Sequence, residues 1–119
     1  MVFEADDIRD WQGRTVVDQG GSKIGSLEGL YYDTAAQFPA FASVSVGIPG
    51  RKRLTFVPLT DAKVSPAHLR VMVDKKTVKD ALTIDADGEL TAEDEPKLFE
   101  HYGLLYQPGA TGERRLGRR

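Results

Sequence analysis

Residue types that could carry out chemistry are sparse in this 119-residue chain. The chain has no cysteine, and its two histidines, His68 and His101, stand in different sequence contexts. Metal sites and acid–base catalysis both favour histidine, but two isolated histidines form neither a ligand cluster nor a catalytic pair. The sequence contains no nucleophile elbow, phosphate-binding loop or dinucleotide fingerprint. It therefore predicts a protein that is not an enzyme and has no catalytic, cofactor or metal site.

The acidic turn at residues 85–89 (DADGE) is the segment of the sequence that most resembles a calcium-binding loop. When Gly88 is placed at the sixth position of a twelve-residue EF-hand loop, two aspartates fall at the third and fifth positions. However, Thr83 then stands where an acid is required, and Asp94 stands where a bidentate glutamate is usual. We therefore interpret the segment as an acidic turn that leads into a helix, where carboxylates suit the helix dipole.

Two groups of cations could bind an acidic partner. The first is the triplet Arg51, Lys52 and Arg53. The second consists of four C-terminal arginines: Arg114, Arg115, Arg118 and Arg119. Residues 1–106 hold 12 Lys/Arg and 17 Asp/Glu, a net −5, whereas residues 107–119 hold four Arg and one Glu, a net +3. The triplet is either a phosphate contact or a solvated hairpin tip. The tail either binds RNA, an acidic protein or anionic lipid, or merely aids solubility.

Four aromatic residues flank one loop: Tyr31, Tyr32, Phe38 and Phe41. Aromatic side chains at the rim of a barrel can form a patch for a protein partner. The alternative is that they complete the hydrophobic core, and both interpretations stay open at this point. No aromatic residue follows Tyr106, so stacking of RNA bases on the tail itself is not supported.

Alternating apolar residues predict the strands that must position these groups. Val44, Val46 and Ile48 fall on one face, which is typical of a half-buried strand. Gly20 and Gly21 supply a turn, and Gly25 and Gly29 indicate a bend within the following strand. The expected strands are residues 15–18, 23–33, 43–48, 54–59 and 69–74. The expected helices are residues 75–82 and a second one that begins at Thr91 or Asp94, ends at Tyr102 and is stopped by Gly103.

The sequence predicts one folded domain with two flanking segments. Residues 1–12 are expected to form a lead-in, 13–106 the domain, and 107–119 a basic, flexible tail. The N-terminus is acidic where a signal peptide would be basic, and no apolar run approaches the ~18 residues of a membrane span. We therefore expect a soluble, cytoplasmic protein.

The opening stretch GRTVVDQGGSKIGSLEGLYYD carries a family resemblance. The residues that carry it are Gly13, Val16, Asp18, Gly21, Ile24-Gly25 and Asp33, followed by the strand at residues 40–47, Phe56-Val57-Pro58-Leu59, Ala62 and the acidic helix at residues 93–106. In this order and spacing they resemble the PRC-barrel domains, which are found in the reaction-centre H subunit and the ribosome-maturation factor.

The resemblance implies a mainly β fold, a small six-stranded antiparallel barrel with short C-terminal helices packed on it. It also implies partner binding rather than catalysis. Our first expectation is a protein-interaction or adaptor module that binds a protein partner or a second copy of itself. The alternatives are an RNA- or ribosome-associated factor that uses the arginine tail and, by resemblance only, a regulator linked to membrane electron transfer. Fold alone does not choose among these functions.

Overall fold

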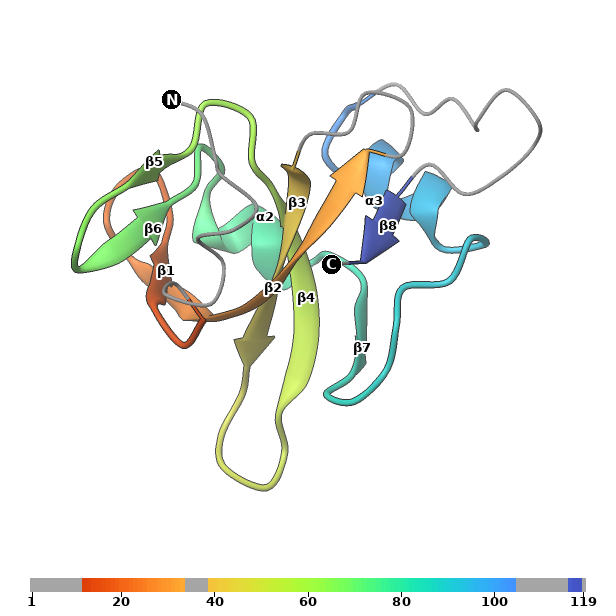
Figure 1. Cartoon of the computed structure of the whole chain (residues 1–119), viewed down its shortest axis with the longest axis horizontal. Helices are drawn as coiled ribbons and strands as arrows, with labels where there is room; N and C mark the ends of the chain where they lie inside the picture. Colours follow the sequence, from red (N-terminus) through yellow and green to blue (C-terminus); the bar gives the residue numbers. More distant parts are fainter. Residues whose placement is uncertain (1–11, 34–38, 105–115, 119) are drawn as a thin grey trace.

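The computed structural model describes residues 12–33, 39–104 and 116–118 (Figure 1). This part of the chain is mainly β, with eight strands and two short helices. The strands are β1 (Thr15–Val17), β2 (Lys23–Asp33), β3 (Pro39–Val46), β4 (Arg53–Pro58), β5 (Lys63–Val64), β6 (His68–Arg70), β7 (Thr83–Asp85) and β8 (Leu116–Arg118). The helices are α2 (Lys75–Lys79) and α3 (Glu95–His101).

The strands form one mixed sheet in the order β5-β6-β1-β2-β3-β4-β7, and β8 pairs with β2 outside this path. All pairs are antiparallel except β1 and β6, which run parallel. Strands β5 and β7 are the two end strands of this order. Within the described residues they do not pair with each other, so the sheet is not closed. The expectation of six antiparallel strands in a barrel is therefore wrong in strand number, direction and closure. The strands that were not predicted are β5, β7 and β8. Each has two or three residues, which are too few for an alternating pattern to be recognised.

The long strand β2 organises the sheet. Its first half pairs with β1, and the residues from Ser26 onward pair with β3. The register with β3 shifts between Leu27 and Gly29, which confirms the predicted irregularity near that glycine. At Gly25, a Cβ atom would lie 2.2 Å from the carbonyl oxygen of Ser45, so the two strands approach too closely for any side chain.

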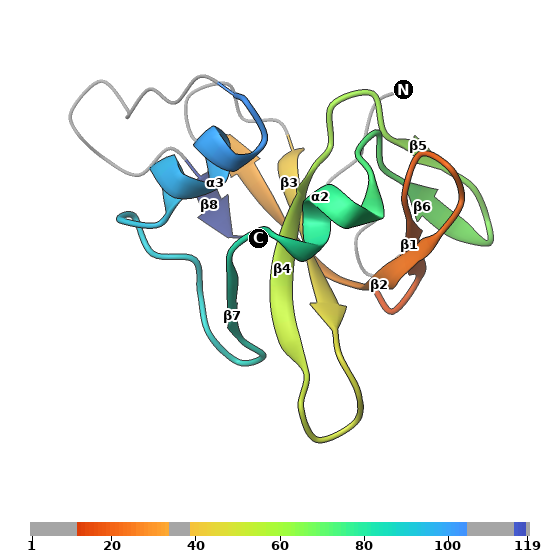
Figure 2. The ribbon, with the colours of Figure 1, turned by 180° about the vertical axis from the view of Figure 1, so that it is seen from behind.

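Two hydrophobic cores occupy the two faces of this sheet. The first core includes Val16, Leu27, Leu30, Ala42, Val44, Val57, Leu69, Val71 and Val78. The second core consists of Tyr31, Phe41, Phe56, Leu90, Leu98, Phe99 and Leu116. Successive residues of β3 and β4 alternate between the cores, because neighbouring side chains of a strand point to opposite faces. Helix α2 contributes to the first core and α3 to the second (Figure 2).

Strand β3 is consequently buried on both faces rather than half-buried as predicted. Ser43 and Ser45 are only 4% and 9% exposed, although they alternate with the apolar residues. Ile48 was expected to share the buried face of Val44, but it lies beyond the end of β3 and is exposed. The Pro-Gly turn that follows Ile48 ends the strand before it reaches that residue.

The C-terminal strand β8 corrects the prediction of a flexible tail for residues 116–118, whereas residues 107–115 and 119 lie outside the described residues. Leu116 is fully buried in the second core, and β8 pairs antiparallel with the end of β2. The Leu116 N–H donates a hydrogen bond to Oε1 of Glu95, a buried residue of α3, at 3.3 Å. The short Leu116–Arg118 stretch lies among Gly and Arg residues, and only its tertiary contacts identify it as a strand.

The predicted helices are present but differ in length. Helix α3 begins after Asp94 and ends before Gly103, whose φ of 69° suits a helix stop, as expected. Helix α2 ends at Lys79 rather than Leu82. The residues from Thr83 to Asp85 form β7 instead, because the β-branched Thr83 and Ile84 pair with β4.

Candidate functional site

The predicted aromatic patch belongs to the core. Tyr31 and Phe41 are each 1% exposed, and Tyr32 is 9% exposed. The ring of Tyr31 meets that of Phe56 edge-on at 5.4 Å, an arrangement that aromatic pairs favour. These three side chains offer no surface to a partner, so the core interpretation holds for them. Phe38 lies outside the described residues.

The acidic turn and the histidines serve local structure. Asp85 accepts a hydrogen bond from Nη1 of Arg53 at 3.1 Å. His68 Nδ1 lies 2.7 Å from the Ser65 hydroxyl, and His101 Nε2 lies 2.7 Å from the carbonyl oxygen of Thr77. Among the residues that the structure describes, no group of three His, Cys, Asp or Glu side chains could hold a metal ion.

The loop between β3 and β4 projects beyond the rest of the sheet (Figures 1 and 2). We call its residues 48–52 the tip. The Arg51 N–H donates to the carbonyl oxygen of Ile48 at 2.9 Å, with Pro49 and Gly50 between them. Proline at the second position and glycine with a φ of 86° at the third are typical of a type II turn. The tip is therefore closed by its own backbone.

The predicted cation triplet divides into two parts. Nε of Arg53 donates to Oγ1 of Thr83 at 2.9 Å, and its Nη1 pairs with Asp85, so Arg53 is anchored to β7. Arg51 and Lys52 are exposed, and neither side chain has an ion pair or hydrogen bond with the described residues. Their neighbour Ile48 is 63% exposed, the one large hydrophobic side chain so placed in the described part of the chain. The tip thus combines one apolar side chain with two unpaired cations.

The side chains of the four predicted tail arginines are not among those that the structure describes. Arg114, Arg115 and Arg119 lie outside the described residues, and of Arg118 only the backbone position in β8 is described. Ile48 was missed as a site residue because its alternation with Val44 and Val46 indicated a buried position. The signal that could have identified it is the Pro49-Gly50 turn immediately after it.

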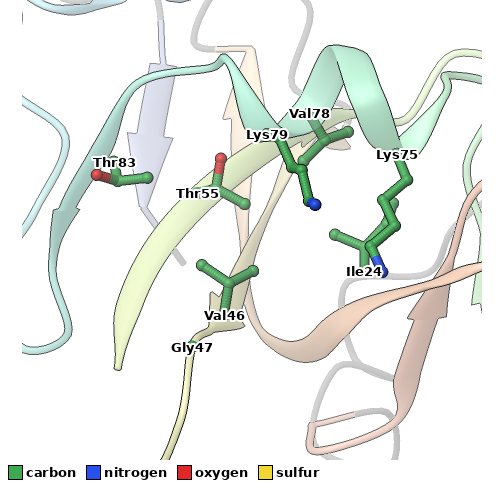
Figure 3. Close-up of a pocket in the computed structure, with 8 residues that line it drawn as sticks. All are labelled: Ile24, Val46, Gly47, Thr55, Lys75, Val78, Lys79 and Thr83. Atoms are coloured by element: carbon green, nitrogen blue, oxygen red, sulfur yellow. The ribbon is translucent and has the colours of Figure 1, made fainter. Parts of the chain in front are cut away.

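A pocket of about 260 Å³ lies beneath α2, beside the base of the β3–β4 loop (Figure 3). Apolar side chains from three elements line it, namely Ile24, Val46 and Val78. Lys75 and Lys79 of α2 also line it, and both side chains leave the helix on the pocket side. Sequence reasoning missed this pocket because its walls come from separate segments. The one local signal is the pair of lysines four residues apart, which share a helix face.

The carboxylate of Asp18 fixes the position of α2. Its Oδ1 accepts hydrogen bonds from the N–H groups of Gly20 and Ser22, at 2.9 and 2.8 Å. Its Oδ2 accepts the N–H of Lys75, the first residue of α2, at 2.9 Å. These backbone hydrogen bonds, led by that from Lys75, hold the pKa of Asp18 below its ordinary value. The turn after β1 and the start of α2 are thereby joined through one side chain.

These features define a small mainly β domain whose sheet is covered on both faces and from which the tight tip of the β3–β4 loop projects. A model of the PRC-barrel domain family matches residues 3–90, most of the chain. The chain therefore belongs to the PRC-barrel domain family, as the sequence resemblance predicted. This domain is generally a non-catalytic module of the protein-interaction type. No curated protein matches the chain. In the part of the chain that the structure describes, no helix is long and apolar enough to cross a membrane.

Proposed function

We propose that this chain is a non-enzymatic adaptor that docks a protein partner on the tip, residues 48–52. The observation that carries the proposal is the 63% exposure of Ile48 beside the unpaired cations Arg51 and Lys52. Exposed apolar side chains are common singly, but this one belongs to the β3–β4 loop, which projects from the described sheet (Figure 1). An apolar anchor surrounded by charge is the usual composition of a small interface centre.

The rigidity of the tip favours binding. Gly47 has a φ of 102°, and a Cβ atom there would lie 2.6 Å from the carbonyl oxygen of Arg51. This position therefore requires glycine, and the Arg51–Ile48 turn hydrogen bond restrains the loop before any partner binds. A preorganised loop loses less conformational entropy on binding, so more of the contact energy appears as affinity.

The chemistry of the tip selects the partner. Two cations favour an acidic surface, which they would attract over a distance and orient. Ile48 requires an apolar notch within that acidic surface, since its side chain gains free energy only when it leaves water. We therefore expect an acidic protein surface with a hydrophobic depression. A second copy of this chain is one such candidate, because residues 1–106 carry a net charge of −5.

The test is capture of partners from a lysate of the source cell on four immobilised proteins: the wild type, Ile48→Asp, the double variant Arg51→Glu/Lys52→Glu, and Lys63→Glu. Lys63 is an exposed cation on β5, away from the tip, and its reversal serves as the control for a charge change outside the tip. We expect one acidic protein to bind the wild type and the control and to be lost from both tip variants. Titration of that purified protein should then show binding at least about 30-fold weaker for Ile48→Asp, the scale of a hot-spot residue.

Other results would redirect or reject the proposal. Capture that disappears after nuclease treatment, weakens steeply with salt and survives Ile48→Asp would support the RNA-associated alternative, because counterion release governs such binding. Sedimentation of the purified wild type as a dimer, with Ile48→Asp monomeric, would identify a second copy as the partner. Retention of every captured protein by both tip variants would reject the tip as the binding surface.

A further inference from the structure

The pocket beneath α2 has the composition of a site for a small amphipathic molecule. Its volume of about 260 Å³ is slightly below the usual range for ligand pockets, roughly 300–1,000 Å³. Ile24, Val46 and Val78 give it apolar walls. Val78 is only 4% exposed and belongs to the first core, so the pocket opens directly onto packed hydrophobic side chains.

The polar side chains that line the pocket are two threonines, Thr55 and Thr83, and two lysines, Lys75 and Lys79. The hydroxyl of Thr55 donates to the carbonyl oxygen of Leu82 at 3.3 Å. The hydroxyl of Thr83 accepts the hydrogen bond from Arg53. The Thr55 hydroxyl proton is thereby used, whereas the Thr83 hydroxyl can still donate to a bound anion. The ammonium groups of Lys75 and Lys79 supply the positive charge that would recognise that anion.

These two ammonium groups are not neutralised by the rest of the structure. Over the described residues, neither Nζ atom has an ion pair or a hydrogen bond. Asp18 accepts the backbone N–H of Lys75 and Asp74 accepts the side-chain amide of Gln19, and among the described residues neither carboxylate forms an ion pair with Lys75 or Lys79. Two like charges four residues apart on a helix destabilise each other slightly, and a bound anion between them would remove that cost.

We propose that the pocket binds an aliphatic carboxylate of about eight carbons, with the chain against the apolar walls and the carboxylate between Lys75 and Lys79. A volume of about 260 Å³, slightly below the usual range for ligand pockets, limits the occupant to a short chain. Charge complementarity requires an anion, and the apolar walls require an aliphatic chain. This site differs from the tip in its residues and in the class of its ligand.

Octanoate is the probe for a titration of the whole chain, followed by the methyl resonances of isoleucine and valine. We expect saturable shifts at Ile24, Val46 and Val78 with a Kd of about 1 mM or below. Octanol and octylamine, which have the same chain without the negative charge, should bind more weakly than octanoate. Equal binding of octanol would reject the role of the lysines, and no saturable shift up to about 10 mM octanoate would reject the site.

Single substitutions of the lysines in α2 test which ammonium groups contribute to octanoate binding. Lys75→Gln and Lys79→Gln should each weaken octanoate binding by about two- to fivefold, as expected for partly exposed ion pairs. Lys76→Gln is the matched control, because Lys76 lies on the same helix, is exposed and does not line the pocket. An equal loss in Lys76→Gln would mean that binding depends on net charge alone and would overturn the proposal. These variants leave the tip unchanged, so failure here is distinguishable from failure of the proposed function.

Discussion

Replacement of Leu116 by alanine tests whether the C-terminal strand β8 is part of the folded core. Leu116 is fully buried against the aromatic second core, and its backbone N–H bonds to the buried Glu95. If residues 107–119 formed only a flexible tail, shortening this side chain would leave stability unchanged. In the structure, the change instead removes the Cγ atom and both Cδ methyl groups from a closed hydrophobic environment.

The expected cost follows from that burial. Loss of these three carbon groups, at about 0.8 kcal/mol each, forfeits about 2.4 kcal/mol of transfer free energy. The cavity adds to this, so we expect Leu116→Ala to lower the free energy of unfolding by about 3–4 kcal/mol. A domain of this size has a total of roughly 5–15 kcal/mol, so the loss is a large fraction of it. The corresponding fall in Tm is about 10–15 °C.

Urea unfolding followed by circular dichroism measures the effect, with Ile48→Ala as the matched control. Ile48 is also a large aliphatic residue, but it is 63% exposed, so its truncation should change the free energy of unfolding by less than about 0.5 kcal/mol. Leu116→Met should retain most of the stability, because it conserves volume. A Leu116→Ala protein as stable as the Ile48→Ala protein would refute the assignment of β8 to the core.

Two further substitutions test the framework around the pocket. Gly25→Ala should cost about 2–3 kcal/mol in urea unfolding because its Cβ would clash with the Ser45 carbonyl oxygen, whereas Gly20→Ala meets only an ordinary 3.6 Å contact; equal stability of the two variants would contradict this. Asp18 has a lowered folded-state pKa, so its contribution is present above the unfolded value near 4 and is lost as pH falls through the folded pKa. Asp18→Asn should therefore have a lower free energy of unfolding at pH 7, and that free energy should fall less as the pH is lowered. An unchanged dependence of the free energy of unfolding on pH would show that the Asp18 carboxylate does not contribute to acid sensitivity.

Local sequence patterns predicted the elements that are long enough to show them. Strand β2 has the predicted bounds because β-branched and aromatic residues follow a Gly-rich turn. Helix α3 was predicted from Asp94 and Gly103, which flank it in the structure. Strands β5, β7 and β8 were missed because two or three residues carry no readable period, and tertiary pairing decides their conformation. The parallel pairing of β1 with β6 likewise depends on a long-range crossover.

The candidate site was predictable only in part, for the same reason. The triplet at residues 51–53 was recognised from its charge, but the anchoring of Arg53 depends on the pairing of β4 with the unpredicted β7. The sequence could not show whether the aromatic residues face solvent or the core, because a strand that is buried on both faces has no polar side to indicate its orientation. Tyr31 and Phe41 therefore fit a surface patch or a second core equally well until α3 and β8 are placed over them.

Burial on both faces also limits where this domain can bind anything. All residues from Phe41 to Ser45 are buried, so the centre of the sheet presents no surface on either side. Binding surfaces must then lie where the sheet ends or where its cover is incomplete. The tip satisfies the first condition and the pocket beneath α2 satisfies the second, and they meet at Gly47, which lines the pocket and begins the projecting loop. Both proposed binding surfaces therefore lie at the margins of the described sheet rather than on its buried faces.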